Sequence, residues 1–321
     1  MKHNRKKLIV NGVLVVLLAL VCLVSLLSGP VRVPFEQWSY SGIIRLRLAR
    51  TVLAVVAGAG LSSAGLIFQA LLRNPLAEPY VLGVSSGAGL GAAMAIVLGL
   101  GAVSIWTLPG MAFAGALATI VLVYALSFTS GGVVPSQTLL LAGITVSSVL
   151  SSMLMFLVSV APSEELHSVV WWLLGNLQVT DWRLLRVVAI IVPLGLVMAA
   201  LFSRDLNLMT LGEEPATYLG LDVEWTKKMF FLVASLITGA VVAACGLIGF
   251  AGLIVPHCMR LLVGPDHRLL LTATALAGAA FLVLADSMAR TIIAPQEIPI
   301  GVITALCGGP FFLFQIGRAH V

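Results

Sequence analysis

The chain has 321 residues, of which 60% are hydrophobic and only 10% are charged, and its formal net charge is +5. An ordinary globular domain has about 25% charged and about 45–50% apolar residues, so a mean hydropathy of +1.10 excludes a water-soluble domain and indicates an integral membrane protein. The apolar segments are as long as membrane-spanning helices, which argues against a β-barrel of short alternating strands.

The first apolar segment, residues 8–27, follows a basic amino terminus and therefore has the general pattern of a signal peptide. Its apolar core is too long for one, and Ser28-Gly29-Pro30 is a poor cleavage site. We therefore predict that this segment is a membrane span.

The hydropathy pattern predicts an all-α integral membrane protein with about ten transmembrane helices in one domain, residues 1–316. The ten expected spans are residues 8–28, 48–71, 82–101, 108–128, 138–160, 184–202, 229–245, 247–263, 269–291 and 299–316. An even number of spans places both termini on one side, and the basic amino terminus places that side in the cytoplasm.

Basic residues support this orientation only in part. Eleven of the 18 Lys and Arg residues fall on the predicted cytoplasmic side, and the other seven fall outside. Much of the outside charge comes from Arg45, Arg47 and Arg50, which precede the second span. Two explanations remain open, namely docking of an acidic partner and snorkelling of the side chains to lipid headgroups.

Small residues recur at four-residue spacing in two spans. Ala54, Gly58 and Ser62 do so in the second span, and Gly83, Gly87 and Gly91 do so in the third. Faces of this kind let helix backbones approach closely in lipid, so they predict tight helix packing.

The longest predicted cytoplasmic loop, residues 203–228, carries a stripe of apolar residues. Glu213 and Glu214 stand before Pro215, an arrangement that suits the first turn of a helix. We therefore expect short amphipathic helices that face a soluble partner. A position flat on the membrane is disfavoured because the central helix is acidic.

The loop before residue 183 carries Trp171, Trp172 and Trp182. Tryptophans at this level usually form an interfacial belt, and an aromatic lining at the mouth of a vestibule is the alternative.

Motifs for catalysis or metal binding are absent from the sequence. There is no phosphate-binding loop, no HExxH and no metal-spaced His/Cys cluster, and His257 has the position of an anchoring residue. The four cysteines lie within or beside apolar spans without a CxxC pair, which predicts buried thiols.

Acids inside membrane spans are costly and usually functional, and Asp286 and Glu297 are the two candidates. Asp286 and Arg290 stand four residues apart, so an ion pair within one helix would satisfy both. A proton-coupled carrier should show an unpaired acid near midspan, and none is evident. The energy for any transport is therefore expected from another chain.

Several long motifs occur in an order that resembles the FecCD-type permeases, the membrane subunits of bacterial importers for iron-siderophores, haem and cobalamin. The resemblance covers about residues 35–316 and is carried by RLAR at 47–50, QALLRNPLAEPYVLGVSSGAGLGA at 69–92, LLLAG at 139–143, GLIGFAGLIVPH at 246–257, RLLVGPDHR at 260–268, LADSMAR at 284–290 and EIPIGVITALCGGPFF at 297–312. It implies a cobalamin-importer-type permease fold.

The resemblance also implies three groups of site residues. Arg47, Arg50 and Arg290 are expected to dock an extracytoplasmic substrate-binding protein through charge-assisted pairs. The expected cytoplasmic gate consists of Asn74, Pro75 and Leu76 together with Ser136 and Gln137, although Pro135-Ser136-Gln137 departs from the family pattern. The expected ATPase-coupling residues are Gly212, Glu213, Glu214, Ala216, Leu219 and Gly220.

The function implied is that of the permease subunit of an ATP-driven importer for a bulky metal chelate, most simply an iron(III)-siderophore. Haem or cobalamin is the alternative within the family, and an ion-coupled secondary transporter or a structural scaffold is the alternative outside it.

The expected partners are a second permease subunit, in a homodimer, two cytoplasmic ATPase subunits and the binding protein, with no nucleic acid. The chain is expected to be a non-enzymatic, multi-pass protein of the bacterial cytoplasmic (inner) membrane. It should bind no cofactor or metal itself, since ATP and Mg²⁺ belong to the ATPase.

The end of the chain, residues 317–321, departs from the basic tail that is usual in the family. It is either an expression scar or the product of a frayed gene end, and it is left out of the functional reasoning.

Overall fold

A computed structural model of the chain describes residues 2–29, 42–128, 134–179 and 181–319, and within these ranges it contains helices, turns and extended segments but no strand. The prediction of an all-α protein is thereby confirmed. The helices are α1 (Lys2–Leu27), α2 (Gly42–Leu71), η2 (Pro79–Leu82), α3 (Val84–Val97), η3 (Leu100–Ala102), α4 (Thr107–Leu126), α5 (Ser136–Val160), α6 (Ser163–Leu173), α7 (Trp182–Leu201), α8 (Ser203–Met209), α9 (Glu213–Tyr218), α10 (Val223–Cys245), α11 (Ala251–Val263), α12 (His267–Thr291) and α13 (Ile300–Ala319).

Among the described residues, seven helices are long and apolar enough to cross a membrane, namely α1, α2, α4, α5, α7, α10 and α12. The helices α3, α11 and α13 are apolar but shorter. Together these helices fall on the ten predicted segments. The number of ten crossings stays a prediction because three of the helices are short.

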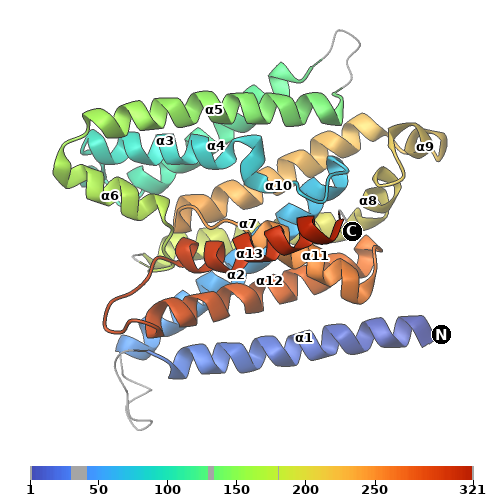
Figure 1. Ribbon diagram of the computed structural model, residues 1–321, viewed down its shortest axis with the longest axis horizontal. Coiled ribbons are helices and arrows are strands. Elements are labelled where there is room, and N and C mark those ends of the chain that lie inside the picture. The colour runs from blue at the N-terminus through green and yellow to red at the C-terminus, as the bar shows by residue number, and fades with distance from the viewer. Residues whose placement is uncertain (1, 30–41, 129–133, 180, 320–321) are drawn as a thin grey trace.

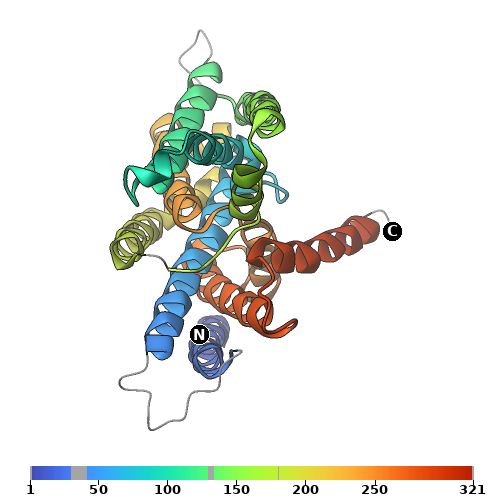
Figure 2. The ribbon, with the colours of Figure 1, turned by 90° about the vertical axis from the view of Figure 1, so that its left-hand side faces the viewer.

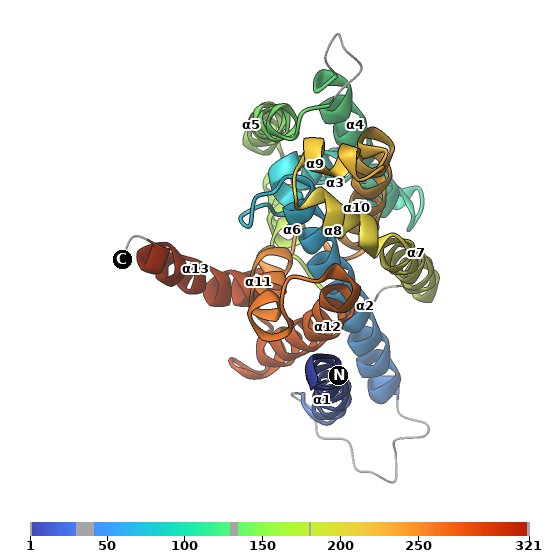
Figure 3. The same ribbon diagram turned by 90° about the vertical axis from the view of Figure 1, so that its right-hand side faces the viewer.

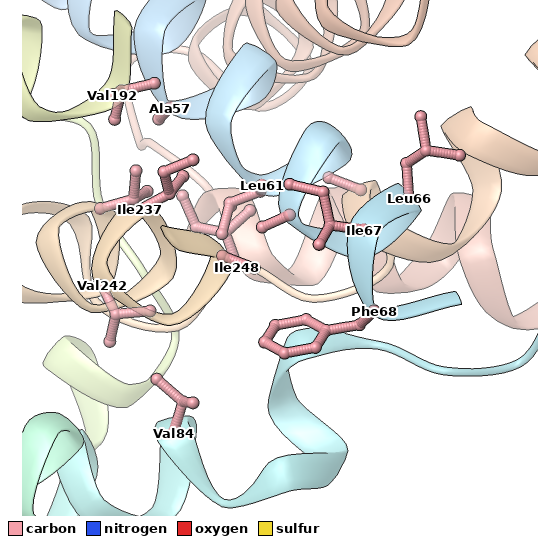
Figure 4. Packing of buried hydrophobic residues seen from close by; sticks show 14 of the residues in the cluster. Ala57, Leu61, Leu66, Ile67, Phe68, Val84, Val192, Ile237, Val242 and Ile248 are labelled. Carbon is pink, nitrogen blue, oxygen red and sulfur yellow. The ribbon is translucent and has the colours of Figure 1, made fainter. Parts of the chain in front are cut away.

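Helix α2 lies at the centre of the bundle and contacts α7, α10, α11 and α12. Figure 3 shows these helices around it, with α1 beside α12 at the edge and α13 projecting sideways, as Figure 2 shows from the opposite end. Almost every residue of α2 from Ala57 to Leu71 is buried. In Figure 4, Leu61 of α2 lies near Ile237 of α10 and Ile248, which follows α10, and Phe68 lies further along α2 in the same cluster. Helix α2 is thus the core element to which the predicted sites are attached.

The predicted small-residue faces are helix contacts. A Cβ atom at Gly58 would collide with the backbone carbonyl of Gly278 on α12, and one at Gly87 would collide with that of Gly115 on α4. Larger side chains at these positions would force the helices apart. The pairs α2–α12 and α3–α4 therefore pack backbone to backbone, as predicted.

The span predicted for residues 247–263 begins later in the structure, at Ala251, because the chain is not helical where this span was expected to begin. Residues 246–250 are irregular, and Gly246 and Phe250 both have positive φ. Tyr80 replaces the missing helical partners, since its hydroxyl donates to Ile248 O at 2.9 Å and accepts from Ile248 N at 2.8 Å. Glu78 accepts from Phe250 N at 2.6 Å. Irregular backbone at this depth is tolerated because protein side chains satisfy it.

The connecting loops contain further helices. The predicted amphipathic helices in the loop 203–228 are present as α8 and α9, whereas α6, between α5 and α7, was not predicted. Helices α8 and α9 lie at the same end of the bundle as the start of α1 and the end of α13, and α6 lies at the opposite end (Figure 1). The structure therefore separates the predicted coupling loop from the predicted outer loop by the full length of the bundle.

The cysteine prediction holds only in part. All four thiols are free, and Cys245 is buried, but Cys307 on α13 is exposed in the single chain. The prediction of a buried thiol is therefore wrong for Cys307, because α13 projects from the bundle and leaves that side of the helix uncovered by this chain.

Candidate functional site

Two of the predicted docking arginines, Arg50 and Arg290, pair with carboxylates at the end of the bundle opposite α9. We call Arg47, Arg50, Asp286, Arg290 and Glu297 the arginine cluster. Arg50 of α2 joins α12 to the segment after it, because its Nε lies 2.8 Å from Asp286 Oδ1 and its Nη1 lies 2.8 Å from Glu297 Oε2. Arg290 Nε lies 3.0 Å from Asp286 Oδ2, which confirms the predicted pair within α12. Asp286 is fully buried, and its carboxylate pairs with both Arg50 and Arg290.

The other contacts of the arginine cluster reach α1. Arg290 Nη2 donates to Ser25 Oγ at 2.8 Å, and Arg47 Nη1 donates to Leu26 O at 3.1 Å. The side chains of Arg47 and Arg290 are buried. The structure therefore brings the three predicted docking residues together but turns them toward the protein itself, and their docking role stays a prediction.

Glu297 lies between α12 and α13, outside both helices. Its carboxylate is half-buried and accepts a hydrogen bond from Gln178 Nε2 at 3.2 Å in addition to that from Arg50. Burial alone would raise the pKa of Glu297, but the hydrogen bond and charge of Arg50 lower it below the ordinary value. Glu297 is thus an ionised and partly accessible member of the cluster.

The first predicted gate segment is a tight turn at the end of α2, and we call residues 74–76 the gate loop. Arg73 has a left-handed φ of 46° and ends the helix, and Asn74 N bonds back to Gln69 O at 3.1 Å. Asn74 Oδ1 accepts from Leu76 N at 2.9 Å. Pro75 and Leu76 are exposed at the tip of the turn.

The second predicted gate segment lies against the end of α2, just before the gate loop. Ser136 is the first residue of α5, and its Oγ lies 3.1 Å from Leu71 O, at the end of α2. Gln137 is the next residue and is exposed. The structure therefore brings Ser136 to the end of α2, three residues before the gate loop, although Ser136 and Leu71 are 65 positions apart in sequence.

The predicted coupling residues form α9 and its flanks. Ala216 lies on the buried face of α9, whereas Tyr218 and Leu219 are 90% and 60% exposed. Gly212 and Gly220 both have positive φ and form the turns on either side. A groove of about 480 Å³ runs along the helix, bordered by Glu213, Glu214, Thr217, Tyr218, Leu221 and Glu224.

Glu213 joins α9 to the gate region, with Oε1 accepting from Ser136 Oγ at 2.9 Å and Oε2 lying 2.9 Å from Lys227 Nζ. We call Ser136, Glu213, Glu224 and Lys227 the lysine cluster. Burial alone would raise the pKa of Glu213, but the hydrogen bond and charge of Lys227 lower it below the ordinary value. The predicted gate and coupling residues thus form one connected site.

Comparison with known proteins assigns this arrangement to a family. The family model described as the FecCD transport family matches residues 16–318. The chain belongs to the FecCD transport family. The match covers nearly the whole chain and includes all three groups of predicted site residues.

Individual relatives of this FecCD protein agree with the assignment. The cobalamin import system permease protein BtuC of Halobacterium salinarum is 45% identical over 86% of this chain and 73% of its own length. The hemin transport system permease protein HmuU of Yersinia pestis is 38% identical over 96% of this chain and 95% of its own. A solved structure described as an inward-facing conformation of a putative metal-chelate type ABC transporter is 31% identical, with a TM-score of 0.88 over 97% of this chain and 99% of its own.

Several residues that link separate segments of this FecCD protein were not recognised from its sequence. Lys227 entered only a charge count, and Glu78 and Tyr80 were not recognised as partners of the irregular segment 246–250. The contact of Arg45 with Trp182 was not expected either. The guanidinium carbon of the exposed Arg45 lies 5.7 Å from the centre of the Trp182 ring. The Glu-Pro-Tyr sequence between two spans was the available signal for Glu78 and Tyr80, because polar residues at depth need partners.

An apolar groove lies beside the irregular segment. Its volume is about 520 Å³, and Tyr80, Leu174, Leu247, Phe250, Ala305 and Leu306 border it. It lies between α13 and the segment that Tyr80 holds. Among the residues that the structure describes, no group of three or more His, Cys, Asp and Glu side chains is placed to hold a metal ion.

Proposed function

We propose that this FecCD protein is the permease subunit of an ATP-driven importer that carries an iron(III)-siderophore or a similar bulky metal chelate across the bacterial cytoplasmic membrane. The observation that carries the proposal is the direct contact between the coupling helix α9 and the gate segment at Ser136. Such a contact is what an importer needs if a separate ATPase is to move its gate. The arginine cluster at the other end of α2 suits a second partner.

The ATPase subunits would bind α9. Tyr218 and Leu219 present apolar surface there, and the acidic groove beside them offers polar contacts. Exposed aromatic and aliphatic side chains with a polar rim are typical of protein interfaces. A short helix of this kind can pass a movement of the ATPase to the bundle as a near-rigid body.

The substrate-binding protein would dock over the arginine cluster. Arg50 is paired with Glu297, whose side chain is 32% exposed, so a carboxylate of the binding protein can compete for the same guanidinium. Arg45 and Trp182 lie nearby on the exposed surface and would extend the contact. Docking would therefore exchange one carboxylate for another and would not require a free arginine.

The cargo path would include the groove beside α13. Its apolar lining suits a large ligand that needs few specific contacts. Two relatives are named as permeases for cobalamin and for hemin, which are both bulky metal complexes. A second copy of the chain would close the path from the other side in a homodimer.

The proposal is tested by isolating the chain after co-expression with the ATPase and binding protein encoded beside it. We expect the ATPase to co-purify with the wild-type chain and to be lost when residues 212–220 are replaced by a Gly/Ser segment of equal length. Retention of the ATPase by that variant, or its absence from the wild-type preparation, would contradict the proposal. The cargo is then identified by titrating the binding protein with cyanocobalamin, hemin and a ferric hydroxamate chelate. Tightest binding of the hydroxamate would support the siderophore assignment, and tightest binding of either other ligand would replace it.

A further inference from the structure

Glu213 is the side chain through which α9 contacts two other helices at once. One carboxylate oxygen accepts from Ser136 Oγ at 2.9 Å, and the other lies 2.9 Å from Lys227 Nζ. Ser136 begins α5, and Lys227 lies on α10. Any displacement of α9 must therefore stretch or break a contact to α5, to α10 or to both.

Lys227 is a fixed anchor. Its Nζ lies 2.9 Å from Glu213, 3.1 Å from Glu224 and 2.8 Å from Val134 O, so its three donors have three acceptors. Only 6% of Lys227 is exposed. If Glu213 moved away, Glu224 and Val134 O would still hold the ammonium on α10, so its charge would keep a compensating partner.

The segment before α5 is held to α10 through both backbone groups of Val134. Val134 O accepts from Lys227 Nζ, and Val134 N donates to Glu224 Oε2 at 3.2 Å. The backbone two residues before Ser136 is therefore tied to α10. The remaining freedom at the start of α5 lies at Ser136 itself.

Ser136 has two acceptors for one hydrogen. Its Oγ lies 2.9 Å from Glu213 Oε1 and 3.1 Å from Leu71 O, but a hydroxyl donates one hydrogen at a time. The carboxylate is the stronger acceptor because it is charged. Leu71 O belongs to the end of α2, where carbonyls lack helical partners. If α9 moves away, the hydroxyl can turn to Leu71 O without losing its hydrogen bond.

We propose that Glu213 is a positioning residue that transmits the movement of α9 to the gate, with Lys227 as the anchor and Ser136 as a hydroxyl that alternates between Glu213 and the end of α2. This inference rests on the proposed function, in which α9 binds the ATPase and Ser136 borders the gate. It adds the anchoring of Glu213 by Lys227 and the alternation of the Ser136 hydroxyl between two acceptors. Ser136 lies on the carbonyl of Leu71, three residues before the gate loop, so a change at Ser136 acts on the end of α2 directly.

The test uses the full transporter with its ATPase and binding protein in liposomes. All four native cysteines are replaced by Ala, and Leu76→Cys in the exposed gate loop reports labelling by a maleimide. With Glu213 intact, ATP should change the labelling rate at position 76. In Glu213→Gln the change should shrink about fivefold, the factor expected for about 1 kcal/mol of lost hydrogen-bond coupling, while ATP hydrolysis continues.

Three further variants separate transmission from simple stability. Ser136→Ala should lose the ATP-dependent change as Glu213→Gln does, and Ser136→Thr should keep it because the hydroxyl remains. Asp205→Asn removes the same charge from α8 in the same loop and should keep the change. The double variant Glu213→Gln/Ser136→Ala should be no worse than either single variant, because both remove one connection.

The outcomes are distinct. A full ATP-dependent change in Glu213→Gln or in Ser136→Ala would overturn the inference while leaving the proposed function intact. A loss of ATPase binding in parallel with the loss of labelling change would also overturn it, since the role would then be in docking. If the reference protein itself binds no ATPase, the proposed function fails, and the inference fails with it. Should Glu213→Gln not fold, the comparison of Ser136→Ala with Ser136→Thr decides.

Discussion

The arginine cluster and the lysine cluster are both buried networks of charges, but they differ in how their acids are exposed. In the arginine cluster Asp286 has no exposed surface and lies between Arg50 and Arg290. In the lysine cluster Lys227 is the buried member, and its partners Glu213 and Glu224 are 28% and 35% exposed. Water can replace a partner of an exposed carboxylate but not of a buried one. The buried Asp286 is therefore suited to hold helices together, whereas the exposed carboxylates are suited to change partners, namely Glu213 and Glu224 in the lysine cluster and Glu297 in the arginine cluster.

The largest effect is expected from Asp286→Ala. The substitution leaves Arg50 and Arg290 without their shared buried partner, so it should lower the free energy of unfolding by about 3–5 kcal/mol. Thermal unfolding in detergent measures this change. Glu164→Gln, at an exposed position on α6, serves as the control and should change stability by less than about 0.5 kcal/mol. An effect of Asp286→Ala no larger than the control would show that the arginine cluster does not hold the helices.

A smaller loss of stability is expected from Lys227→Met. The variant keeps the length of the side chain but removes three donors, and the half-exposed Glu213 and Glu224 can turn to water. We expect a loss of about 1–3 kcal/mol in the same unfolding experiment. A loss equal to that of Asp286→Ala would remove the distinction between the two clusters.

Binding of the substrate-binding protein gives a test of the exchange at Arg50. Glu297→Gln removes the competing charge while Asp286 still holds Arg50, so affinity for the binding protein should rise about three- to tenfold. Arg50→Glu should abolish binding. Surface-bound permease in nanodiscs and soluble binding protein are sufficient for the measurement. Weaker binding in Glu297→Gln would mean that Glu297 helps docking and does not compete with it.

The smallest effect is expected from pH. The pKa values of Glu213 and Glu297 both lie below the ordinary value of 4.5, so each ion pair is fully present above that value and is lost only as pH falls through the lowered pKa. The ATP-dependent labelling change at position 76 should therefore be the same at pH 7.5 and at about pH 5.5. A loss of the change within this window would show that Glu213 takes up a proton more easily than its contact with Lys227 allows.

The sequence was sufficient for the elements whose pattern is local. Each long apolar segment predicts its own helix, and the four-residue spacing around Gly58 and Gly87 predicts close packing because it places small residues on one helix face. Glu213 and Glu214 before Pro215 predict the first turn of α9, which is also a local pattern. All of these depend on residues within one or two turns of each other.

Contacts between segments that are distant in the chain could not be predicted from the sequence. Arg50 and Asp286 are 236 residues apart, and no local pattern says that a single guanidinium serves two carboxylates. The lysine cluster likewise draws on α5, α9 and α10. Residues 247–250 of the irregular segment were predicted as helix because they are apolar. Hydropathy carries no information about the hydrogen bonds by which Glu78 and Tyr80 satisfy the backbone there.

Uptake into proteoliposomes shows whether transport by this chain depends on an ATPase. The chain is reconstituted with and without its ATPase, with the binding protein loaded with the chelate it binds most tightly, and accumulation of the labelled metal is followed. We expect uptake only when the ATPase and ATP are both present, and none from an ion gradient alone. Uptake by the permease alone, driven by a proton or sodium gradient, would contradict this expectation.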